Sequence, residues 1–333
     1  MGTPYLGKLK STDPLYEILL SRVCPGVKDP SFLVSRTSSR RVYKYTEEKS
    51  GAVVIGKFFR PDDPQQEKVM RQKREFDNLV KIRGYGFDAP PCYVVRPLTR
   101  EESIGLALAE EFIPGKSLDH ALWKAIFHGK AELLKERLSS LALFFHLLHG
   151  KTERRMRVDL DPVQKYFRAV IDTLHAQRVI PQSDRERFFR LMDIWLSRES
   201  MQKAKRVTVH GDATPTNFIF RGEGEVAAID LERMRESDRA YDVSMICGEL
   251  KHAFLWRTGN PHAAEHFIRY FVTAYCCHFG DPAGAFREIT LRNPFYMALT
   301  ELRISRNGYL GGSYRKRLAA EALECLRGGL ALV

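Results

Sequence analysis

The hydrophobic and polar positions divide the chain into a strand-rich first third and a mainly helical remainder. Residues 14–22 predict a short helix. Three runs between 31 and 60 alternate apolar with polar side chains and are separated by polar or Gly-containing turns. This pattern is typical of antiparallel strands joined by short connections. Residues 64–83 then predict another helix, and two more strand-like runs lie around 91–97 and 104–112.

The helical remainder is interrupted once, at residues 206–231, where short strand-like runs surround a polar loop. Helices are predicted on both sides of this interruption, at 117–128, 131–150, 161–178, 184–200 and from about 240 onwards. A strand-rich part followed by a helical part predicts an α+β protein with two lobes. We place a small antiparallel-sheet lobe at residues 1–113 and a large, mainly helical lobe at residues 114–333.

Two predicted elements of the first lobe carry charged residues among apolar ones. Because side chains alternate along a strand, one face of the run GAVVIGKFF carries Val53, Ile55, Lys57 and Phe59. A lysine in this line is out of place on a buried face. On the helix predicted at 64–83, Glu75 lies on the same stripe as Leu79 and Ile82.

The interruption in the helical lobe contains the most informative polar residues. It reads HGDATPTN from His210 to Asn217 and then AIDLE around Asp230. Phosphoryl transfer needs hard oxygen ligands for metal ions and a carboxylate that orients the incoming hydroxyl. Asp212 and Asn217 have the five-residue spacing of the protein-kinase catalytic loop. Two carboxylates and an amide predict a site for Mg²⁺ rather than for zinc.

These motifs resemble the HGDxxxxN…IDxE signature of aminoglycoside phosphotransferases and their relatives, which include choline, homoserine and fructosamine kinases. The resemblance implies a protein-kinase-like fold and ATP-dependent transfer of the γ-phosphoryl group to a hydroxyl of a small molecule. It implies that Asp212 is the catalytic base or hydroxyl-orienting residue and that His210 supports the catalytic loop. Asn217 and Asp230 would hold Mg²⁺, and Asp242 in DRAYDVS would brace the loop from the following helix.

The resemblance also implies a nucleotide site in the first lobe. Lys57 resembles the third-strand lysine that contacts the α- and β-phosphates, and Glu75 resembles its partner on the helix. The run EEFIPGKSL is similar to the hinge whose backbone binds adenine, which makes Glu111 and Ile113 candidates. No GxGxxG motif lies between the first two strands. The run RTSSRR occupies that turn, where Ser38 is the candidate for contacting phosphate.

Charge bears on the acceptor. The formal net charge of the chain is +12, which favours anionic partners. From residue 251 to 333 there are 11 Lys and Arg against 6 Asp and Glu, a net charge of +5. In the family this part usually lines the acceptor pocket, and a polycationic aminoglycoside would need carboxylates there. We therefore expect a neutral or anionic, sugar-like acceptor. The basic run 303–317 is interpreted as a solvated face, and nucleic acid is not expected as a partner.

Other features bear on location and on alternatives. Six scattered cysteines without a CxxC pair, no signal-peptide pattern and no apolar run near 18 residues favour a cytoplasmic protein. Alternative functions are a kinase of a macromolecular or membrane glycolipid acceptor and a catalytically silent nucleotide-binding module. The HAAEH run at 262–266 fits a zinc hydrolase motif, a weak signal. The motif residues have structural alternatives as turn or capping residues, and Glu75 as an exposed partner of Arg71 or Lys81.

Overall fold

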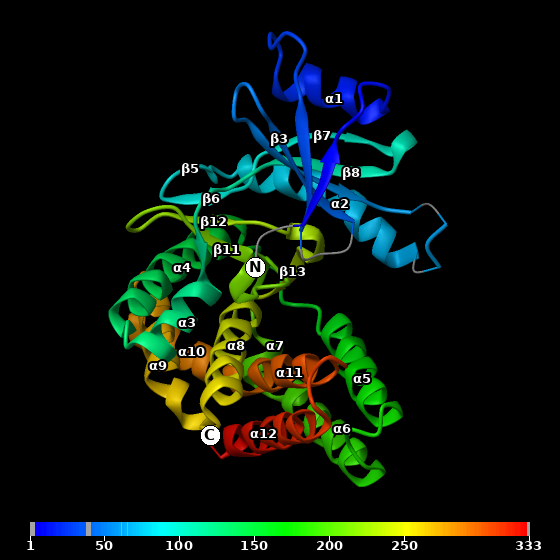
Figure 1. Ribbon diagram of the computed structural model, residues 1–333. Coiled ribbons are helices and arrows are strands. Elements are labelled where there is room, and N and C mark those ends of the chain that lie inside the picture. Colours follow the sequence, from blue (N-terminus) through cyan, green and yellow to red (C-terminus); the bar gives the residue numbers. More distant parts are fainter. Residues whose placement is uncertain (1–3, 38–40, 61, 65, 332–333) are drawn as a thin grey trace. The chain divides into compact units, whose positions relative to one another are not determined.

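The computed structural model describes residues 4–37, 41–60, 62–64 and 66–331 (Figure 1). Its contacts divide the chain into two compact units. The first unit comprises Met1–Gly115 together with Ala227–Met234, and the second comprises Lys116–Val226 and Arg235–Val333. The short segment Ala227–Met234 therefore returns to the first unit, whereas the sequence analysis assigned all of residues 114–333 to one lobe.

The first unit is built on an antiparallel sheet with the strand order β1-β2-β3-β4-β8-β7. Its strands are β1 (Tyr5–Lys8), β2 (Phe32–Arg36), β3 (Val42–Glu47), β4 (Val53–Phe58), β7 (Pro97–Glu101) and β8 (Leu106–Glu111). A turn of 3₁₀ helix, η1 (Glu102–Ile104), connects the last two. A smaller ladder in the same unit joins β5 (Asp88–Ala89), β6 (Cys92–Val94) and β12 (Val226–Ala228). The predicted antiparallel sheet is thus present.

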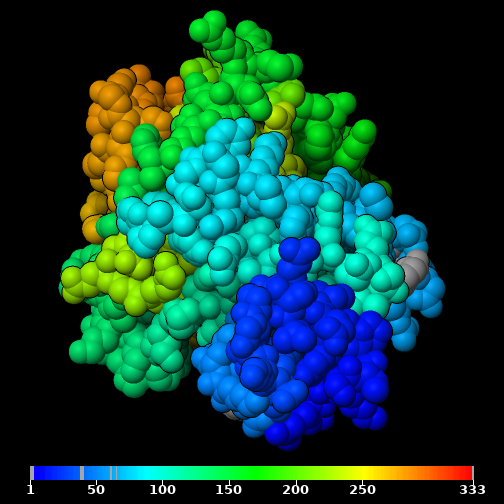
Figure 2. Space-filling view, turned by 90° about the horizontal axis from the view of Figure 1, so that it is seen from above, coloured from blue at the N-terminus to red at the C-terminus, as the bar shows by residue number. Residues whose placement is uncertain are grey.

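Two helices cover the faces of the larger sheet. The helix α1 (Pro14–Val23) buries Leu15 and Leu19 against a cluster that includes Val54 of β4. The helix α2 (Gln66–Arg83) lies on the opposite face, where Val69 packs against Phe59. In Figure 2 the blue N-terminal residues and the cyan residues from α2 onwards belong to this unit. The alternation predicted for β4 is correct, but its fully buried side is the Val54 side, and Lys57 points towards α2.

The second unit is mainly helical, as predicted. Its helices are α3 (Leu118–His128), α4 (Ala131–Thr152), α5 (Asp161–Ala176), α6 (Gln182–Ser197), α7 (Glu199–Gln202), α8 (Ala240–Thr258), α9 (Glu265–Cys276), α10 (Pro282–Thr290), α11 (Asn293–Ser305) and α12 (Gly312–Leu330). Its short strands are β9 (Lys116–Ser117), β10 (Arg206–Val209), β11 (Phe218–Phe220) and β13 (Arg235–Asp238). The strands form two small antiparallel ladders, β10 with β13 and β9 with β11. Their loops carry the predicted catalytic motif.

The core of the second unit is rich in aromatic side chains. Trp195 of α6 is fully buried, stacks near Phe295 of α11, and donates a hydrogen bond from Nε1 to the carbonyl of Leu326, at 3.1 Å. The helix α8 is buried on almost all sides, and it lies so close to α11 that a Cβ added at Gly248 would meet Thr300 at 2.8 Å. Among the described helices of the protein, none is long and apolar enough to cross a membrane.

Candidate active site

In the first unit, Lys57 of β4 lies within a cluster of carboxylates. Its Nζ is 2.6 Å from Oε1 of Glu75 and 3.2 Å from Oε1 of Glu110, and 3.9 Å from Oδ1 of Asp230. The side chain of Lys57 is only 14% exposed and that of Glu75 only 2%. The structure therefore brings together three residues that the sequence analysis singled out, Lys57, Glu75 and Asp230.

Glu110 was not identified from the sequence, and its position follows from strand register. In the β4–β8 ladder Ile55 is opposite Glu110, and Ile55 points to the same side of the sheet as Lys57. Glu110 is therefore a diagonal neighbour of the lysine on the same face, within reach of its long side chain. The only sequence signal was the pair Glu110–Glu111 at the start of the predicted hinge, and the sequence alone does not fix which of the two faces the lysine.

The cluster places three carboxyl groups around a single ammonium. Burial lowers the pKa of the Lys57 ammonium, but Glu110, Glu75 and Asp230 outweigh this effect and raise the pKa well above its usual value. Burial is the main cause that raises the pKa of Glu75, to about 8. Lys57 acts in the opposite direction and lowers this pKa, but Asp230 and Glu110 offset part of its effect. Burial likewise raises the pKa of Glu110. Three carboxyl groups therefore share one ammonium, and an additional cation would favour their ionised forms.

Asp230 is held in an unusual backbone conformation. It precedes the 3₁₀ turn η3 (Leu231–Arg233) with φ 64° and ψ 60°, in the left-handed region that non-glycine residues rarely adopt. Such a conformation costs about 1–3 kcal/mol and is found where the surroundings determine it. Here Asn78 of α2 donates a hydrogen bond to the carbonyl of Leu231 at 2.8 Å. The Asp230 carboxylate remains 38% exposed beside Lys57.

Glu111 and Ile113, the residues predicted to bind adenine, belong to the end of β8 and the segment after it. The Glu111 carboxylate accepts hydrogen bonds from the hydroxyl of Tyr93 and from the backbone N–H of Arg96, and the Glu111 N–H donates to the carbonyl of Arg96. Ile113 is buried. Ser38, the candidate for contacting phosphate, lies outside the described residues. The roles of these three residues stay predictions.

In the second unit, Asp242 in the first turn of α8 organises the motif loop. Its carboxylate accepts hydrogen bonds from the N–H groups of His210, at 2.7 Å, and Gly211, at 3.0 Å. A third bond joins it to Nε2 of His149 on α4, at 3.3 Å, and the other ring nitrogen of His149 is 2.9 Å from the hydroxyl of Tyr275. Asp242 is fully buried, yet its pKa is lowered, because the bonds from His149 and the loop outweigh the effect of burial.

The loop itself is closed by short-range bonds. Nδ1 of His210 accepts from the Asp212 N–H at 3.3 Å, and the Asp212 carbonyl accepts from the N–H of Thr214, at 2.7 Å, and from Nδ2 of Asn217, at 2.9 Å. Because the amide nitrogen of Asn217 is used in this bond, its oxygen is the atom suited to a cation. Asn217 lies in the 3₁₀ turn η2 (Pro215–Asn217) and is buried. His210, Asp212 and Asn217 thus share one loop, and Asp242 anchors it from α8, as the motif implies.

Arg303 of α11 was missed as a partner of this loop. Its Nη1 lies 2.5 Å from Oδ1 of Asp212, and its Nη2 lies 2.6 Å from Oε1 of Glu249 on α8. The side chain of Arg303 is only 16% exposed. The interpretation of the basic run 303–317 as a solvated face is therefore wrong for its first residue. No sequence signal connects Arg303 to Asp212, because the contact depends on how α11 packs.

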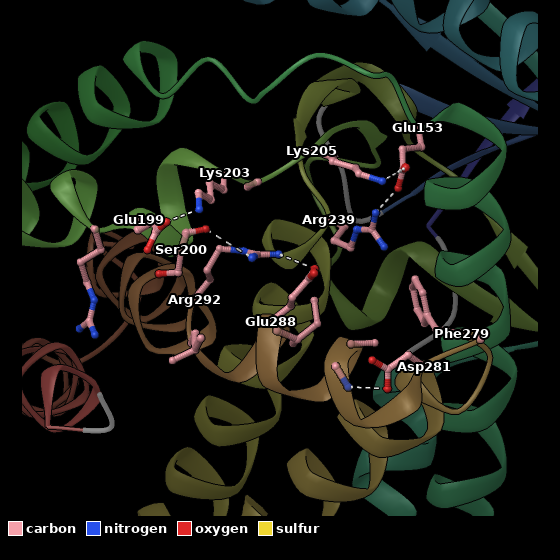
Figure 3. Close-up of a pocket in the computed structure, with 17 residues that line it drawn as sticks. Glu153, Glu199, Ser200, Lys203, Lys205, Arg239, Phe279, Asp281, Glu288 and Arg292 are labelled. Carbon is pink, nitrogen blue, oxygen red and sulfur yellow. Dashed lines mark hydrogen bonds and ion pairs between the residues drawn. The ribbon is translucent and has the colours of Figure 1, made fainter.

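A pocket of about 730 Å³ lies elsewhere in the second unit, around α7 and α10 (Figure 3). It is lined by none of the predicted site residues. Figure 3 shows Lys205 and Arg239 both directed at Glu153, and Lys203 directed at Glu199. Each of these three cations is already paired with a carboxylate of the same wall, and Glu153 serves two of them.

The HAAEH run does not form a metal site. His262 belongs to the 3₁₀ turn η4 (Pro261–Ala264), whereas His266 belongs to α9, so the two do not share one helix. Nδ1 of His262 pairs with Glu265 at 2.6 Å, and the ring of His266 lies against Phe267. Across the described ranges of the chain, no group of three or more His, Cys, Asp and Glu residues is arranged to hold a metal.

Comparisons with known proteins bear on the family and on the fold. The model of the phosphotransferase enzyme family matches residues 33–286. The complex of APH(2")-IIa with streptomycin and ATP is 15% identical, with a TM-score of 0.54, and the match covers 96% of this chain and 97% of that chain. A comparison with the curated proteins finds no match.

Two further solved structures are similar to the chain. Choline kinase LicA from Streptococcus pneumoniae is 16% identical, with a TM-score of 0.58 and coverage of 94% and 98% of the two chains. The ethanolamine kinase of Plasmodium vivax is 11% identical, with a TM-score of 0.61 and coverage of 95% and 89%. At these identities the likeness concerns the fold, and it confirms the predicted α+β protein-kinase-like class. The family match covers most of the chain, which therefore belongs to the phosphotransferase enzyme family, as an enzyme with an alcohol group as acceptor.

Proposed function

We propose that the protein transfers the γ-phosphoryl group of ATP to a hydroxyl of a small molecule, with Mg²⁺ as the cofactor. The observation that carries the proposal is the paired arrangement of the motif residues. Lys57, Glu75 and Asp230 form one cluster in the first unit. In the second unit, Asp212 and Asn217 share a loop that Asp242 anchors.

The oxygen ligands fit Mg²⁺. Magnesium binds carboxylate and amide oxygens, often one or two from the protein together with phosphate oxygens. The Asp230 carboxylate is 38% exposed beside a cluster in which three carboxyl groups share one ammonium, a setting that a divalent cation would complement. Asn217 presents its amide oxygen, because its nitrogen is bonded to the Asp212 carbonyl. When bound, Mg²⁺ would neutralise charge on the phosphate oxygens.

The remaining roles belong to the chain itself. The Lys57 ammonium, oriented by Glu75, would bind the phosphates of the nucleotide. The Asp212 carboxylate would accept the hydrogen bond of the acceptor hydroxyl and would take its proton as the oxygen bonds to the γ-phosphorus. The bond between the γ-phosphorus and the β,γ-bridging oxygen breaks in the same step, and ADP leaves with that oxygen. Arg303 would keep that carboxylate in place through Oδ1. Positioning and charge neutralisation then supply most of the rate enhancement.

The test is magnesium-dependent ATP turnover in two variants. Asp212→Ala and Asp230→Ala should each lower ADP release by a factor of about 10² or more, while circular dichroism shows a folded protein. Glu223→Ala is the matched control, because Glu223 is an exposed carboxylate in the turn after β11. Near-normal turnover in either aspartate variant would overturn the assignment. Titration with ATP, with and without Mg²⁺, separates a silent nucleotide-binding module from an enzyme.

A further inference from the structure

In the second unit, Arg303 forms an ion pair with Asp212, and a second arginine, Arg306, lies near Arg303. Arg306 lies one helical turn beyond Arg303, at the end of α11. Its Nη2 is 3.1 Å from the hydroxyl of Tyr166 on α5, and its guanidinium lies 5.5 Å from the centre of that ring. Residues three positions apart on a helix are neighbours on its surface. Arg306 and Arg303 therefore face the same region.

A third arginine of the second unit packs on a tyrosine in the same way. Arg235 begins β13, and its guanidinium lies 4.2 Å from the ring centre of Tyr241 on α8. Burial lowers the pKa of Arg235, but Tyr241, Asp242 and Tyr166 together raise it. The same two tyrosines also contribute to the raised pKa of Arg303, after Glu249 and Asp212. Tyr241 is thus the aromatic partner of Arg235, as Tyr166 is of Arg306.

The positive charge of Arg306 is not paired with a carboxylate of the described residues. Both nearby carboxylates, Asp212 and Glu249, are bonded to Arg303. The guanidinium of Arg306 donates hydrogen bonds from Nη2 to the Tyr166 hydroxyl, at 3.1 Å, and from Nε to the carbonyl of Arg303, at 3.5 Å. Among the described residues Arg306 has no carboxylate within ion-pair distance. A partly buried guanidinium with a neutral partner retains donors whose geometry matches a phosphate or carboxylate group.

Two further carboxylates of the second unit, Asp119 and Glu301, also form ion pairs. Asp119 of α3 pairs with Arg257 at 2.8 Å, and the buried Glu301 pairs with Lys251 at 3.0 Å. A polycationic acceptor would have to compete with these arginines and with that lysine for the carboxylates. An acceptor with a negative charge would instead complement the guanidinium of Arg306.

We propose that the acceptor is a small polyol or sugar that carries a phosphate monoester, and that Arg306 binds this phosphate while Asp212 faces the hydroxyl to be phosphorylated. The inference rests on the proposed function and names its substrate class. Tyr166 completes the anion-binding region by holding the guanidinium of Arg306. Arg306 is a specificity-determining residue in this scheme, since it contacts the part of the acceptor that does not react.

The first experiment compares matched acceptors by ADP release. The pairs are ribose with ribose 5-phosphate and glycerol with glycerol 3-phosphate, with glycerate as the carboxylate and kanamycin as the polycation. We expect a kcat/KM at least about tenfold higher for the phosphorylated member of one pair, which corresponds to one or two charge-assisted hydrogen bonds. Arg306→Gln should remove this preference, mainly by raising the KM of the phosphorylated acceptor. Arg327→Gln is the control, because Arg327 is an exposed arginine of α12 that pairs with Glu324.

A second experiment separates failure of this inference from failure of the proposed function. Calorimetric titration of the nucleotide-free protein with ribose 5-phosphate and with glycerol 3-phosphate reports on Arg306 whether or not ATP is turned over. Binding that is at least about tenfold weaker in Arg306→Gln than in wild type and in Arg327→Gln supports the inference. Absence of binding to wild type, equal binding to all three proteins, or a preference for kanamycin or for the neutral acceptors overturns it. Preference for glycerate over the phosphates would also contradict the phosphate assignment.

Discussion

Glu301 of α11 shows what burial does to a charged residue in this protein. Its carboxylate is fully buried, and Lys251 of α8 lies 3.0 Å away. Burial outweighs this lysine and raises the pKa of Glu301 to about 7. In an unfolded chain the pKa of a glutamate is about 4.3. The folded protein therefore binds this proton more tightly than the unfolded protein does.

The sign of the pH dependence follows from this difference. The stability that Glu301 contributes is fully present below pH of about 4.3 and is lost as the pH rises through about 7. In Glu301→Gln this loss is absent, so between these limits the variant should gain on wild type by up to about 1.4 kcal/mol per pH unit. Urea unfolding of both proteins at pH 5 and pH 8 measures the effect.

The control for this comparison is Glu321→Gln. Glu321 pairs with the same lysine at 3.2 Å, but its side chain is 25% exposed, whereas that of Glu301 is not exposed at all. The pH dependence of Glu321→Gln should therefore resemble that of wild type. If Glu301→Gln and wild type lost the same free energy of unfolding between pH 5 and pH 8, Glu301 would not be the titrating group.

The residues that sequence reasoning found and missed differ in how their contacts arise. Asp212 and Asn217 are bonded within one short loop, so their spacing along the chain predicts their proximity. Glu110 reaches Lys57 only through the register of β4 and β8, and Arg303 reaches Asp212 only through the packing of α11. Register and helix packing depend on the whole core, and no short motif encodes them.

At the scale of elements, the amphipathic pattern was a reliable guide and the polar strands were not. The helix α2 was predicted from a stripe that contains Glu75 and Leu79, and both are buried. By contrast β13 reads RESD and has no apolar alternation. It is a strand because β10 supplies a partner, with Val209 opposite Arg235. Tertiary pairing thus created an element that local propensity does not indicate.

Two neighbouring glycines of α12 offer a direct test of how tightly this helix packs. A Cβ at Gly329 would lie 2.5 Å from Pro294 and 2.7 Å from Trp195, whereas a Cβ at Gly328 would meet nothing within 4 Å. Gly329→Ala should therefore lower the free energy of unfolding by about 1–3 kcal/mol, the usual cost of overpacking. Gly328→Ala should be neutral or stabilising by up to about 1 kcal/mol, because alanine favours the helix.

Chemical denaturation of the two variants and of wild type distinguishes these outcomes. Equal midpoints for the two alanine variants would show that α12 moves away from α6 and α11 without cost, contrary to the packing described above. Because the substitutions are adjacent and identical in chemistry, differences in composition or helix propensity do not confound the comparison.

At the scale of the whole molecule, the chain passes from the second unit into the first and back again. The segment Ala227–Met234 supplies β12 and η3 to the first unit. The Val95 N–H donates to the carbonyl of Ala228 at 3.1 Å, and Asn78 donates to that of Leu231. Val226, Ala227 and Ala228 are buried, as is Leu231. The N-terminal residues therefore depend on a strand that comes more than a hundred positions later.

This dependence predicts how fragments behave. A fragment of residues 1–115 lacks both hydrogen bonds, each with a net value of about 1 kcal/mol, and the apolar burial of β12. It should unfold at a lower urea concentration than the same fragment joined through a Gly/Ser linker to residues 225–236. Circular dichroism during urea titration compares the two. Coincident transitions would mean that β12 is dispensable for the first unit.

The same topology limits how such chains can be recombined. A single exchange at residue 115 would join the N-terminal part of one relative to the C-terminal part of another. The sheet of the first unit would then pair with β12 of a different protein, and Asp230 would come from a different parent than Lys57. In functional chimaeras of this protein, the segment Ala227–Met234 should therefore come from the same parent as the N-terminal part. Such chimaeras need a crossover at each end of this segment in addition to the one at residue 115.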